Sequence, residues 1–281
     1  MREHVFSDPA KFLAVAGDYL RENEAENSLV LGLADDLARR SPDADASTPW
    51  FLYVTEGEDP ESSGLLAAWQ TLPYIVGLTR TGREDVITTV APIVAPRFAV
   101  AEYLMGPRPG VRLLVEKITA TRQCTADLQM EQALHIVRRV TPVPEVAGKM
   151  QQATTDDLPI AFELLSAFVA ATDQRQIDVT TVRHVIEAGE IFLWVDGTPR
   201  ALAAWSGRSG NGVRINRVYT PPEYRRQGYA TACVAALSQR LLDDGCAYCT
   251  LYTDLANPTA NRIYSKIGYQ RIGDNAIYKI S

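Results

Sequence analysis

The segment from Val213 to Asp243 constrains the fold of this chain more than any other part of the sequence. An apolar strand pattern up to Tyr219 is followed by a turn rich in proline, arginine and glycine, and then by a long helix. The apolar residues of that helix are spaced four, three and four apart: Ala230, Val234, Leu237 and Leu241. A strand, a tight turn and an amphipathic helix in this order predict an α/β fold.

Further elements on both sides of this segment indicate a mixed sheet. Before it, one helix pattern runs from Ile160 to Thr172 and a second from Val179 to Ala188. Strand patterns follow at 191–195 and 200–205, and another lies beyond the long helix at 248–253. We therefore expect a central, mostly antiparallel sheet flanked by helices.

Two domains are expected from the length and from a proline-rich linker. A chain of 281 residues exceeds the usual size of one hydrophobic core. Pro142 and Pro144 lie one residue apart, favour an extended chain and break helices on both sides. We therefore expect one domain over residues 1–141 and another over residues 142–281.

The two halves share a pattern that indicates an internal repeat. In the first, Phe51–Val54 leads through a turn to Leu66–Trp69. In the second, Phe192–Val195 leads through a shorter turn to Leu202–Trp205. The last segment of each pattern reads Leu-Ala-Ala-Trp. The matching order of neighbouring elements favours two similar α/β domains in tandem over a chance match of four common residues.

Composition and charge exclude several classes of function. The formal net charge of −6 lies in residues 1–150, with 15 basic against 21 acidic residues, whereas residues 151–281 hold 13 of each. This is not the basic excess of a nucleic-acid-binding domain, and no apolar run approaches the ~20 residues of a membrane span. Four cysteines in this length do not make a disulfide framework, and with three histidines they show no metal-ligand spacing. We expect a cytoplasmic protein with no metal, no nucleic-acid partner and no membrane partner.

The turn before the long helix has the composition of a phosphate-binding site. The first amides of a helix have no partner within it, and the helix dipole adds positive charge there. Gly228 permits close approach of the backbone, and Arg225 and Arg226 supply charge-assisted hydrogen bonds. From these residues alone, a site for a small anion and an ordinary turn with solvated arginines are equally good interpretations.

Two motifs in this half resemble those of the GNAT superfamily of acyl-CoA-dependent N-acyltransferases. Residues 225–230, Arg-Arg-Gln-Gly-Tyr-Ala, match its Arg/Gln-x-x-Gly-x-Gly/Ala signature. Residues 257–269 are similar to its second motif, which runs from an asparagine through a tyrosine to a Gly-aromatic pair. The resemblance covers residues 148–281 and reaches residues 1–141 only through the repeat. It implies two tandem GNAT-like domains, the first of them degenerate.

The resemblance also implies a role for each motif residue. The pantetheine of the acyl donor is expected on the free backbone of the strand end, at Val218, Tyr219 and Thr220. The pyrophosphate is expected on the amides of the turn and of the first helical residues, at Arg225, Arg226, Gln227, Gly228, Tyr229, Ala230 and Thr231. Asn257 is expected to contact the pantetheine arm, and Tyr264 to face the thioester sulfur.

The chemistry of acyl transfer is consistent with Tyr264 as the catalytic residue. An amine attacks the thioester, an oxyanion forms, and a thiolate with a pKa of about 8.5 departs. A tyrosine with a reference pKa of about 10 can hydrogen-bond that thiolate, although full proton transfer is uphill by about 2 kcal/mol. The other interpretation is a core tyrosine on the helix that begins near Pro258.

The general base has no single candidate. Many members of the superfamily carry a glutamate on the strand before the turn, where residues 214–217 here read Arg-Ile-Asn-Arg. Glu223 and Asp254 lie nearby in the sequence, and either can hold a water. A substrate amine that loses its proton to solvent is an equal alternative.

The first half has no counterpart of these motifs. Its corresponding turn contains Gly82, but Glu84 and Asp85 follow and repel phosphate, and no segment resembles 257–264. We expect a structural first domain that walls one side of the acceptor pocket, and one acetyl-CoA per chain.

The expected function is that of an N-acetyltransferase, which transfers an acetyl group from acetyl-CoA to a primary amine of a small molecule or peptide. Acetyl-CoA is then a cosubstrate, the amine is the other partner, and a homodimer is left open. A tandem amino-acid N-acyltransferase that uses a larger acyl-CoA, and a non-catalytic acyl-CoA sensor, are the alternatives. The sequence does not identify the amine.

Overall fold

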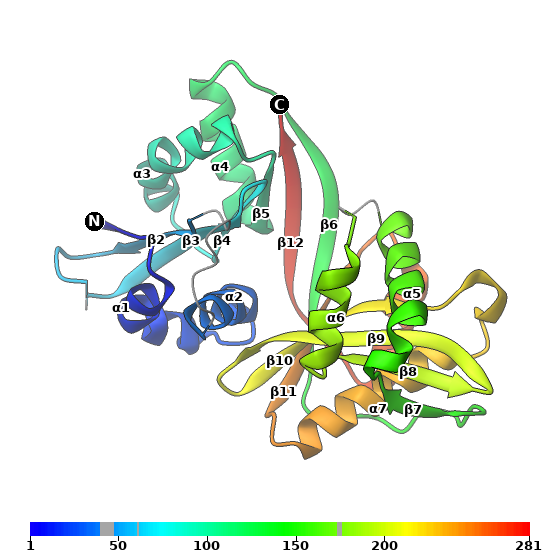
Figure 1. Ribbon diagram of the computed structural model, residues 1–281. Coiled ribbons are helices and arrows are strands. Elements are labelled where there is room, and N and C mark those ends of the chain that lie inside the picture. The colour runs from blue at the N-terminus through cyan, green and yellow to red at the C-terminus, as the bar shows by residue number, and fades with distance from the viewer. Residues whose placement is uncertain (40–47, 61, 173–175) are drawn as a thin grey trace.

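The computed structural model describes residues 1–39, 48–60, 62–172 and 176–281, and within them one twelve-stranded sheet runs through two lobes (Figure 1). The strand order is β1-β2-β3-β4-β5-β12-β6-β11-β10-β9-β8-β7. The first six strands of this order form the sheet of the first lobe, and the other six form the sheet of the second. This arrangement confirms the predicted fold class of two tandem, mostly antiparallel α/β domains.

Most of the first lobe comes from the N-terminal half of the chain. Its strands are β1 (Arg2–Phe6), β2 (Trp50–Thr55), β3 (Gly64–Leu72), β4 (Ile75–Leu78) and β5 (Tyr103–Pro107). Its helices are α1 (Pro9–Glu22), α2 (Ser28–Arg39), α3 (Glu84–Val94) and α4 (Arg108–Thr121), and a 3-10 helix spans Ala95–Ala99. The side chain of Asp8 caps α1 because its Oδ1 accepts the Ala10 amide at 2.9 Å.

Most of the second lobe comes from the C-terminal half, and the strands and helices predicted there are present. Its strands are β7 (Lys149–Gln152), β8 (Ile191–Asp196), β9 (Thr198–Ser209), β10 (Gly212–Tyr219) and β11 (Tyr248–Asp254). Its helices are α5 (Leu158–Ala171), α6 (Val179–Glu187), α7 (Tyr229–Asp243) and α8 (Pro258–Ile267), with 3-10 turns at Thr155–Asp157 and Pro222–Tyr224. None of the helices in the described ranges is long and apolar enough to cross a bilayer.

Each lobe is completed by a strand from the other half of the chain. β6 (Ala126–Val137) precedes the proline linker, yet it pairs antiparallel with β11 of the second lobe. β12 (Gln270–Ile280), near the C-terminus, pairs antiparallel with β5 of the first lobe. The two exchanged strands also pair with each other and join the two sheets (Figure 1). The sheet therefore crosses the boundary that the sequence places at residues 141 and 142.

The two lobes repeat the same arrangement of cores. In the first lobe, one core lies under α1 and α2 and the other under α3 and α4. In the second, α5 and α6 cover one face, and α7 and α8 cover the other. The matching tetrapeptides are nevertheless out of phase, because Trp69 packs under α1 and α2 whereas Trp205 packs against the α7–α8 core. Successive side chains of a strand point to opposite faces of the sheet. When the two lobes are superimposed, the two Leu-Ala-Ala-Trp segments are therefore shifted against each other by an odd number of residues.

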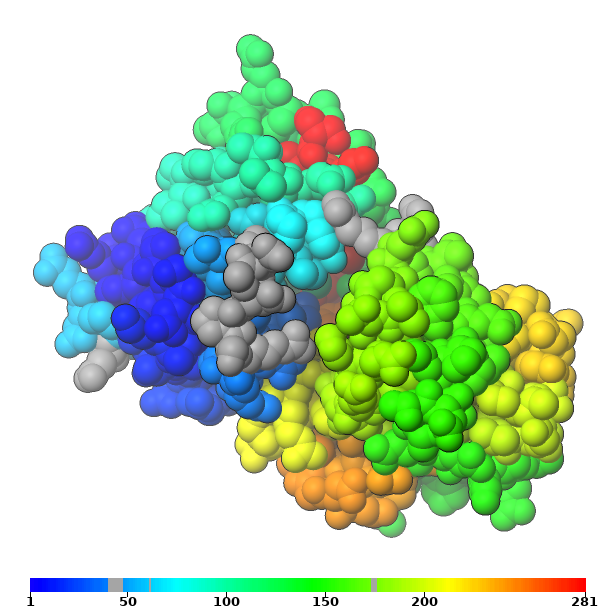
Figure 2. All heavy atoms as spheres, in the orientation of Figure 1, coloured from blue at the N-terminus to red at the C-terminus, as the bar shows by residue number. Residues whose placement is uncertain are grey.

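Helix α2 of the first lobe packs on the sheet of the second. A Cβ atom added to Gly32 would lie 2.6 Å from the Cα atom of Gly207 on β9, so the two backbones are in contact. Near the same seam, the carboxylate of Glu24 accepts hydrogen bonds from the amide and the side-chain Nδ2 of Asn211, each at 2.8 Å. Figure 2 shows the blue residues around α2 against the yellow hairpin of β9 and β10. The first lobe therefore covers part of the second lobe's sheet.

Candidate active site

The parallel strands β10 and β11 pair over only three residues and then separate. Pairing runs from Gly212 opposite Tyr248 to Arg214 opposite Thr250. The rest of both strands, within the described part of the chain, has no register partner across this gap. Backbone groups on the open edge of β10 are therefore available to a ligand that enters between the strands. The residues predicted to hold pantetheine lie at the end of this edge: Val218, Tyr219 and Thr220.

A β-bulge redirects the end of β10. Its register with β9 shifts between Asn216 and Tyr219, and Arg217 within the bulge has a φ of 49°. A left-handed conformation costs a residue with a side chain about 1–2 kcal/mol and persists where the surrounding structure holds it. Just beyond the bulge, the Thr220 hydroxyl is buried and no hydrogen-bond partner is found for it among the described residues. The open edge therefore ends at a buried hydroxyl group that is available to hydrogen-bond a ligand.

The turn between β10 and α7 ends in a glycine that no other residue replaces without strain. Gly228 is the N-cap of α7 with a φ of 92°, and an added Cβ would lie 2.8 Å from the Cγ1 atom of Val146. The first intrahelical bond runs from the Ala232 amide to the Gly228 carbonyl at 2.9 Å. No side chain of the described residues caps the helix, so the amides from Tyr229 to Thr231 are free donors.

The two arginines of this turn are held differently. Arg225 Nε donates to the Thr220 carbonyl at 3.1 Å, which folds the side chain back over the end of β10. Arg226 is exposed and has a φ of 63°. Gln227 Nε2 donates to the Glu223 carbonyl at 3.1 Å and closes the turn. Both predicted arginines lie in one turn with the free amides of α7, and Arg225 is already oriented.

Tyr264 lies on α8, which begins at a capping asparagine. Asn257 Oδ1 accepts the Ala260 amide at 3.0 Å, so this oxygen serves the helix and the side-chain Nδ2 remains for a ligand. Tyr264 packs in the α7–α8 core and meets the ring of Tyr269 edge-on, with 5.9 Å between centroids. Within the described residues its hydroxyl has no hydrogen-bond partner, which leaves the hydroxyl free to donate to a bound group.

Burial decides what Tyr264 can do chemically. The apolar surroundings raise the pKa of Tyr264 well above its ordinary value near 10, because they disfavour the charged phenolate. Full proton transfer to a thiolate with a pKa of about 8.5 is therefore less favourable than for an exposed tyrosine. A neutral hydroxyl that donates a hydrogen bond to developing negative charge fits this environment better.

The structure gives the two carboxylates considered as general bases different surroundings, and neither is shown to face the donor site. Glu223 is exposed in the 3-10 turn at Pro222–Tyr224. Asp254 Oδ1 accepts the Ala256 amide at 2.8 Å and so holds the loop before α8. Neither contact orients a carboxylate toward the open edge of β10, and proton loss to solvent stays the simpler route.

Sequence reasoning missed a hydrogen-bond chain from the exchanged strand to α8. His135 Nε2 on β6 lies 3.2 Å from Thr253 Oγ1, although the two residues are 118 positions apart. Thr253 Oγ1 donates to Asn261 Oδ1 at 2.6 Å, and Asn261 Nδ2 donates to the carbonyl of Asn257 at 2.9 Å. This chain fixes the first turn of the helix that carries Tyr264. No local pattern marks His135, because its partner becomes apparent only once β6 joins β11.

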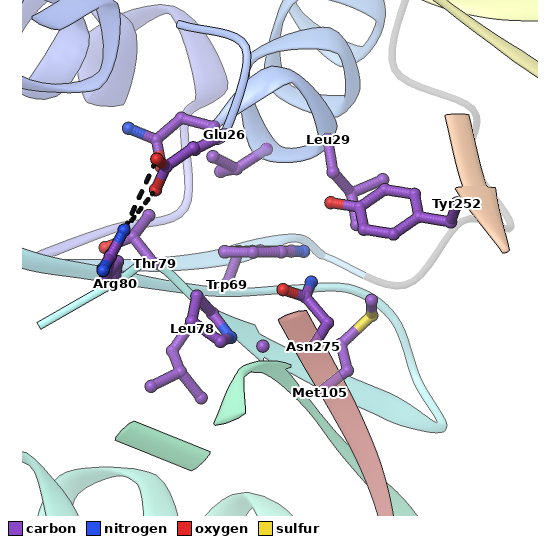
Figure 3. A pocket seen from close by; sticks show the side chains of 13 residues that line it. Glu26, Leu29, Trp69, Leu78, Thr79, Arg80, Met105, Tyr252 and Asn275 are labelled. Atoms are coloured by element: carbon purple, nitrogen blue, oxygen red, sulfur yellow. Dashed lines mark hydrogen bonds and ion pairs between the residues drawn. The ribbon is translucent and has the colours of Figure 1, made fainter. Parts of the chain in front are cut away.

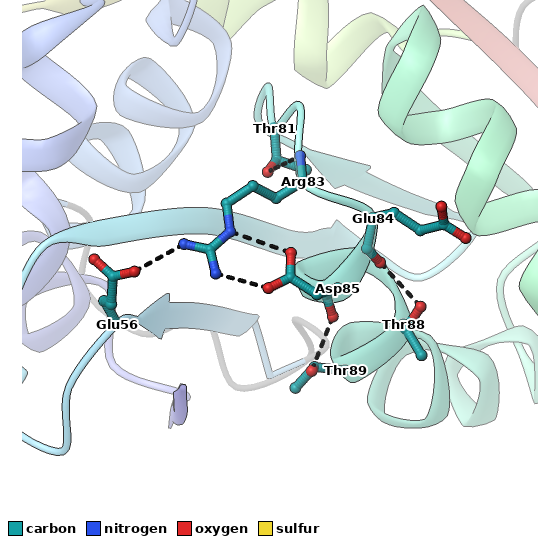
Figure 4. Close-up of polar contacts among 7 residues, drawn as sticks. All are labelled: Glu56, Thr81, Arg83, Glu84, Asp85, Thr88 and Thr89. Atoms are coloured by element: carbon teal, nitrogen blue, oxygen red, sulfur yellow. Dashed lines mark hydrogen bonds and ion pairs between the residues drawn. The ribbon is translucent and has the colours of Figure 1, made fainter.

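In the first lobe, the equivalent turn is occupied by its own ion pairs (Figure 4). Arg83 precedes α3 and binds both oxygens of Asp85, at 3.1 and 2.7 Å, and Glu56 Oε1 at 2.9 Å. The Arg83 guanidinium holds the pKa of Asp85 below its ordinary value, so this carboxylate stays charged in the first turn of α3. The arginine at this turn of the first lobe is therefore neutralised by carboxylates, in line with the acidic residues that the sequence places there.

A small cavity lies where β4 and β5 end, at the position that corresponds to the gap between β10 and β11 (Figure 3). Its volume is about 20 Å³, which is room for about one water molecule. Trp69, Leu78 and Met105 line it from the first lobe, and Tyr252 and Asn275 close it from β11 and β12. An acyl chain does not fit this space.

Comparison with known families gives one match. Residues 194–278 match the family model described as FR47-like protein, a range that contains the open edge of β10, the turn, α7 and Tyr264. No curated protein sequence matches the chain.

Solved structures share the fold over almost the whole chain. A protein from Drosophila has a TM-score of 0.69 and 11% identity and covers 99% of this chain and 98% of its own. The GCN5-related N-acetyltransferase from Sphaerobacter thermophilus has a TM-score of 0.62 and 12% identity, over 99% and 95%. A tandem GNAT protein from the clavulanic acid biosynthesis pathway has a TM-score of 0.55 and 12% identity, over 100% and 98%.

These comparisons establish the fold of the chain and a family likeness of its second lobe. The two-lobed α/β sheet is the fold of GNAT acetyltransferases, including a tandem one. Residues 194–278 are in addition similar to the FR47-like family.

Proposed function

We propose that the second lobe transfers an acetyl group from acetyl-CoA to a primary amine of a small molecule or peptide. The observation that carries this proposal is that, among the residues the structure describes, the second lobe alone combines an open strand edge, free helix amides and an unpaired tyrosine hydroxyl. The equivalent positions of the other lobe are occupied by ion pairs and by packed side chains.

The donor would be held along the path from the turn to the open edge. The pyrophosphate would accept hydrogen bonds from the amides of residues 226–231 and from the side chain of Arg225, in a region where the α7 dipole adds positive charge. The Arg225 amide, which the sequence placed in the same set, instead donates to the Pro222 carbonyl at 3.3 Å. The pantetheine amides would pair with the free backbone at 218–220, in the manner of an added strand, and Asn257 Nδ2 would donate to the pantetheine arm.

The reaction then needs few protein groups. A neutral amine attacks the thioester carbon, the tetrahedral oxyanion collapses, and the C–S bond breaks. Tyr264 donates a hydrogen bond to the departing sulfur, which takes its proton from the attacking nitrogen or from water. The proton of the ammonium substrate leaves through solvent, since the described part of β10 carries no carboxylate.

The division at residues 141 and 142 and the supporting role of the first domain belong to the same proposal. Helix α2 lies against β9 on the face opposite α7, so the first lobe is suited to form one wall of the acceptor pocket. A catalytic second lobe and a structural first lobe are consistent with the small size of the first lobe's own cavity.

Turnover measured with acyl-CoA of two, four, eight and sixteen carbons tests the proposal. CoA thiol release with a mixture of primary amines should be fastest with acetyl-CoA. Fastest release with a long chain would indicate an N-acyltransferase for larger acyl groups. Tight binding of acetyl-CoA without release to any amine would indicate a sensor.

A further inference from the structure

Two arginines on β10 lie beside the open edge with their charges uncompensated. Arg214 points to the sheet face opposite the α7–α8 core, because its neighbours Val213 and Ile215 are buried in that core. Its Nη2 lies 3.4 Å from Ser206 Oγ, and its Nη1 is buried with no hydrogen-bond partner among the described residues. Arg217 follows in the bulge and repels it electrostatically.

No carboxylate oxygen of the described residues lies within 4 Å of either guanidinium group. Asp36 on α2 and the Tyr252 hydroxyl act on Arg214 over a longer range, and Glu190 acts on Arg217. Burial lowers the pKa of both arginines, which is the sign of cations withdrawn from water without a close counter-ion. Both side chains are half-buried, and like charges drawn partly out of water are costly unless an anion joins them.

An orphaned acceptor lies between the two arginines. Asn216 Nδ2 donates to Ser206 Oγ at 2.6 Å, which fixes the plane of the amide. The other end of that amide, Oδ1, is buried and receives no hydrogen bond from the described residues. A bound N–H group would satisfy it.

The position of this group relative to the donor site decides what it can bind. Arg214 is the last β10 residue that pairs with β11, so Asn216 lies just past the point where the strands separate. Helix α2 packs on the same face at Gly207, whose added Cβ would lie 3.3 Å from Arg214 Nη2. Arg214 therefore lies under the first lobe, and Asn216 and Arg217 follow it along β10 at the mouth of the gap.

We propose that the amine substrate is an amino carboxylate, such as a free α-amino acid, whose carboxylate binds Arg214 and Arg217 and whose amine donates to Asn216 Oδ1. The inference rests on the proposed acetyl transfer and adds the chemical class of the acceptor. A carboxylate supplies the missing negative charge, and an amine held beside the open edge lies next to the thioester that the edge would bind.

Paired acceptors test this class directly. CoA release from saturating acetyl-CoA is measured with each proteinogenic amino acid, with its methyl ester and, for histidine, tryptophan, lysine and phenylalanine, with the decarboxylated amine. At least one free amino acid should exceed its ester and its decarboxylated form tenfold or more in kcat/KM. Equal or better turnover of the neutral forms would overturn the inference, and so would no turnover of any amino acid.

Calorimetry with acetyl-CoA keeps the two claims apart. Acetyl-CoA binding with turnover of carboxyl-free amines would leave the proposed acetyl transfer standing and remove only the acceptor class. Absence of acetyl-CoA binding would remove both.

Variants of the two arginines test whether they bind the substrate or only support the fold, because only a binding role changes KM for the amino acid selectively. Arg214→Gln and Arg217→Gln should raise KM for the preferred amino acid at least tenfold, leave KM for acetyl-CoA unchanged and bring the ratio over the methyl ester toward one. Arg112→Gln, at an exposed arginine of α4 that pairs with Glu116, is the control and should change none of these. Arg214→Gln should also melt no lower than wild type, because it removes a buried unpaired charge. Lower Tm with an unchanged preference for the carboxylate would show that the arginine is structural.

Discussion

His135 Nε2, on a strand from the first half of the chain, lies 3.2 Å from Thr253 Oγ1 in the second half. Through Thr253 and Asn261 the contact supports the first turn of α8. The other ring nitrogen, Nδ1, is buried without a partner among the described residues. Burial lowers the pKa of His135 below 6.5, Arg271 lowers it further, and Asp274 opposes them.

The sign of the pH dependence follows from that lowered pKa. Between the folded pKa of His135 and the unfolded value near 6.5, the unfolded chain binds the proton more tightly, so stability rises with pH in this window and falls on acidification. The free energy of unfolding in urea should therefore change less between pH 7.5 and pH 5.5 in His135→Gln than in wild type. The slope that His135 contributes is at most about 1.4 kcal/mol per pH unit. His184→Gln, at an exposed histidine of α6, is the control. An unchanged slope in the His135 variant would mean that other groups set the acid sensitivity.

Tyr264→Phe should lower kcat by about ten- to a thousandfold while the affinity for acetyl-CoA stays the same, because only the hydrogen bond to the departing sulfur is lost. Single-turnover kinetics measure the chemical step. Tyr269→Phe is the matched control: its hydroxyl is 2.8 Å from Ser238 Oγ and should matter for stability but not for kcat. An undiminished rate for Tyr264→Phe would assign the role to another group.

Gly228→Ala should abolish stabilisation by acetyl-CoA, since a Cβ at this φ of 92° strains the turn and would lie 2.8 Å from Val146 Cγ1, so the turn must move from the position in which it presents the amides. For wild type, acetyl-CoA at a hundredfold excess over Kd should add about 2.7 kcal/mol to the free energy of unfolding. Gly245→Ala places the same strain, at a φ of 94°, after the other end of α7 where a Cβ meets nothing within 4 Å. That control should lose baseline stability and keep the acetyl-CoA effect. Loss in both variants would show that strain alone explains the result.

Calorimetric titration of the full chain should give one acetyl-CoA per chain, and the Gly228→Ala variant should give no binding heat. The first lobe offers Asp85 bound to Arg83 in place of free amides, and a cavity of about 20 Å³ in place of an open edge. The intact chain is the right sample because a fragment that ends near Thr141 lacks β12, which the first lobe needs. Two equivalents, or residual binding by the variant, would locate a second site in the first lobe.

Gly32→Ala should destabilise the chain, because its Cβ would enter the backbone of Gly207 at 2.6 Å and push α2 off the second lobe. The same substitution at Gly17 on α1 is the control, since its Cβ meets only the flexible end of Arg21. Gly17→Ala should be neutral or stabilising by up to about 1 kcal/mol. Chemical unfolding measures both, and equal effects would contradict the tight contact between the lobes.

The sequence predicts those elements of the structure that neighbouring residues determine, and it does not predict those that depend on distant parts of the chain. The turn at 220–228 and helix α7 are encoded by neighbouring residues, and their predicted bounds hold within a residue or so. The repeat was inferred correctly from element order, yet the tetrapeptides that suggested it lie on opposite faces, because four common residues carry no register. Strand exchange was out of reach: β6 and β12 have ordinary strand patterns, and only the whole sheet decides their partners. For the same reason no local pattern indicated that His135 supports α8.

The exchanged strand β12 also has a consequence for how the protein is made. Ala276 and Ile280 belong to the core of the first lobe, yet they follow the other strands of the second lobe in the sequence and leave the ribosome after them. The first lobe, although synthesised first, is therefore expected to stay open until β12 has left the ribosome, after the other strands of the second lobe. Ribosome-bound chains stalled before Gln270 should be sensitive to protease in the first lobe, and resistance there would contradict this order. The delay exposes the free edge of β5 until β12 pairs with it, which makes this edge the place where a chaperone would be needed.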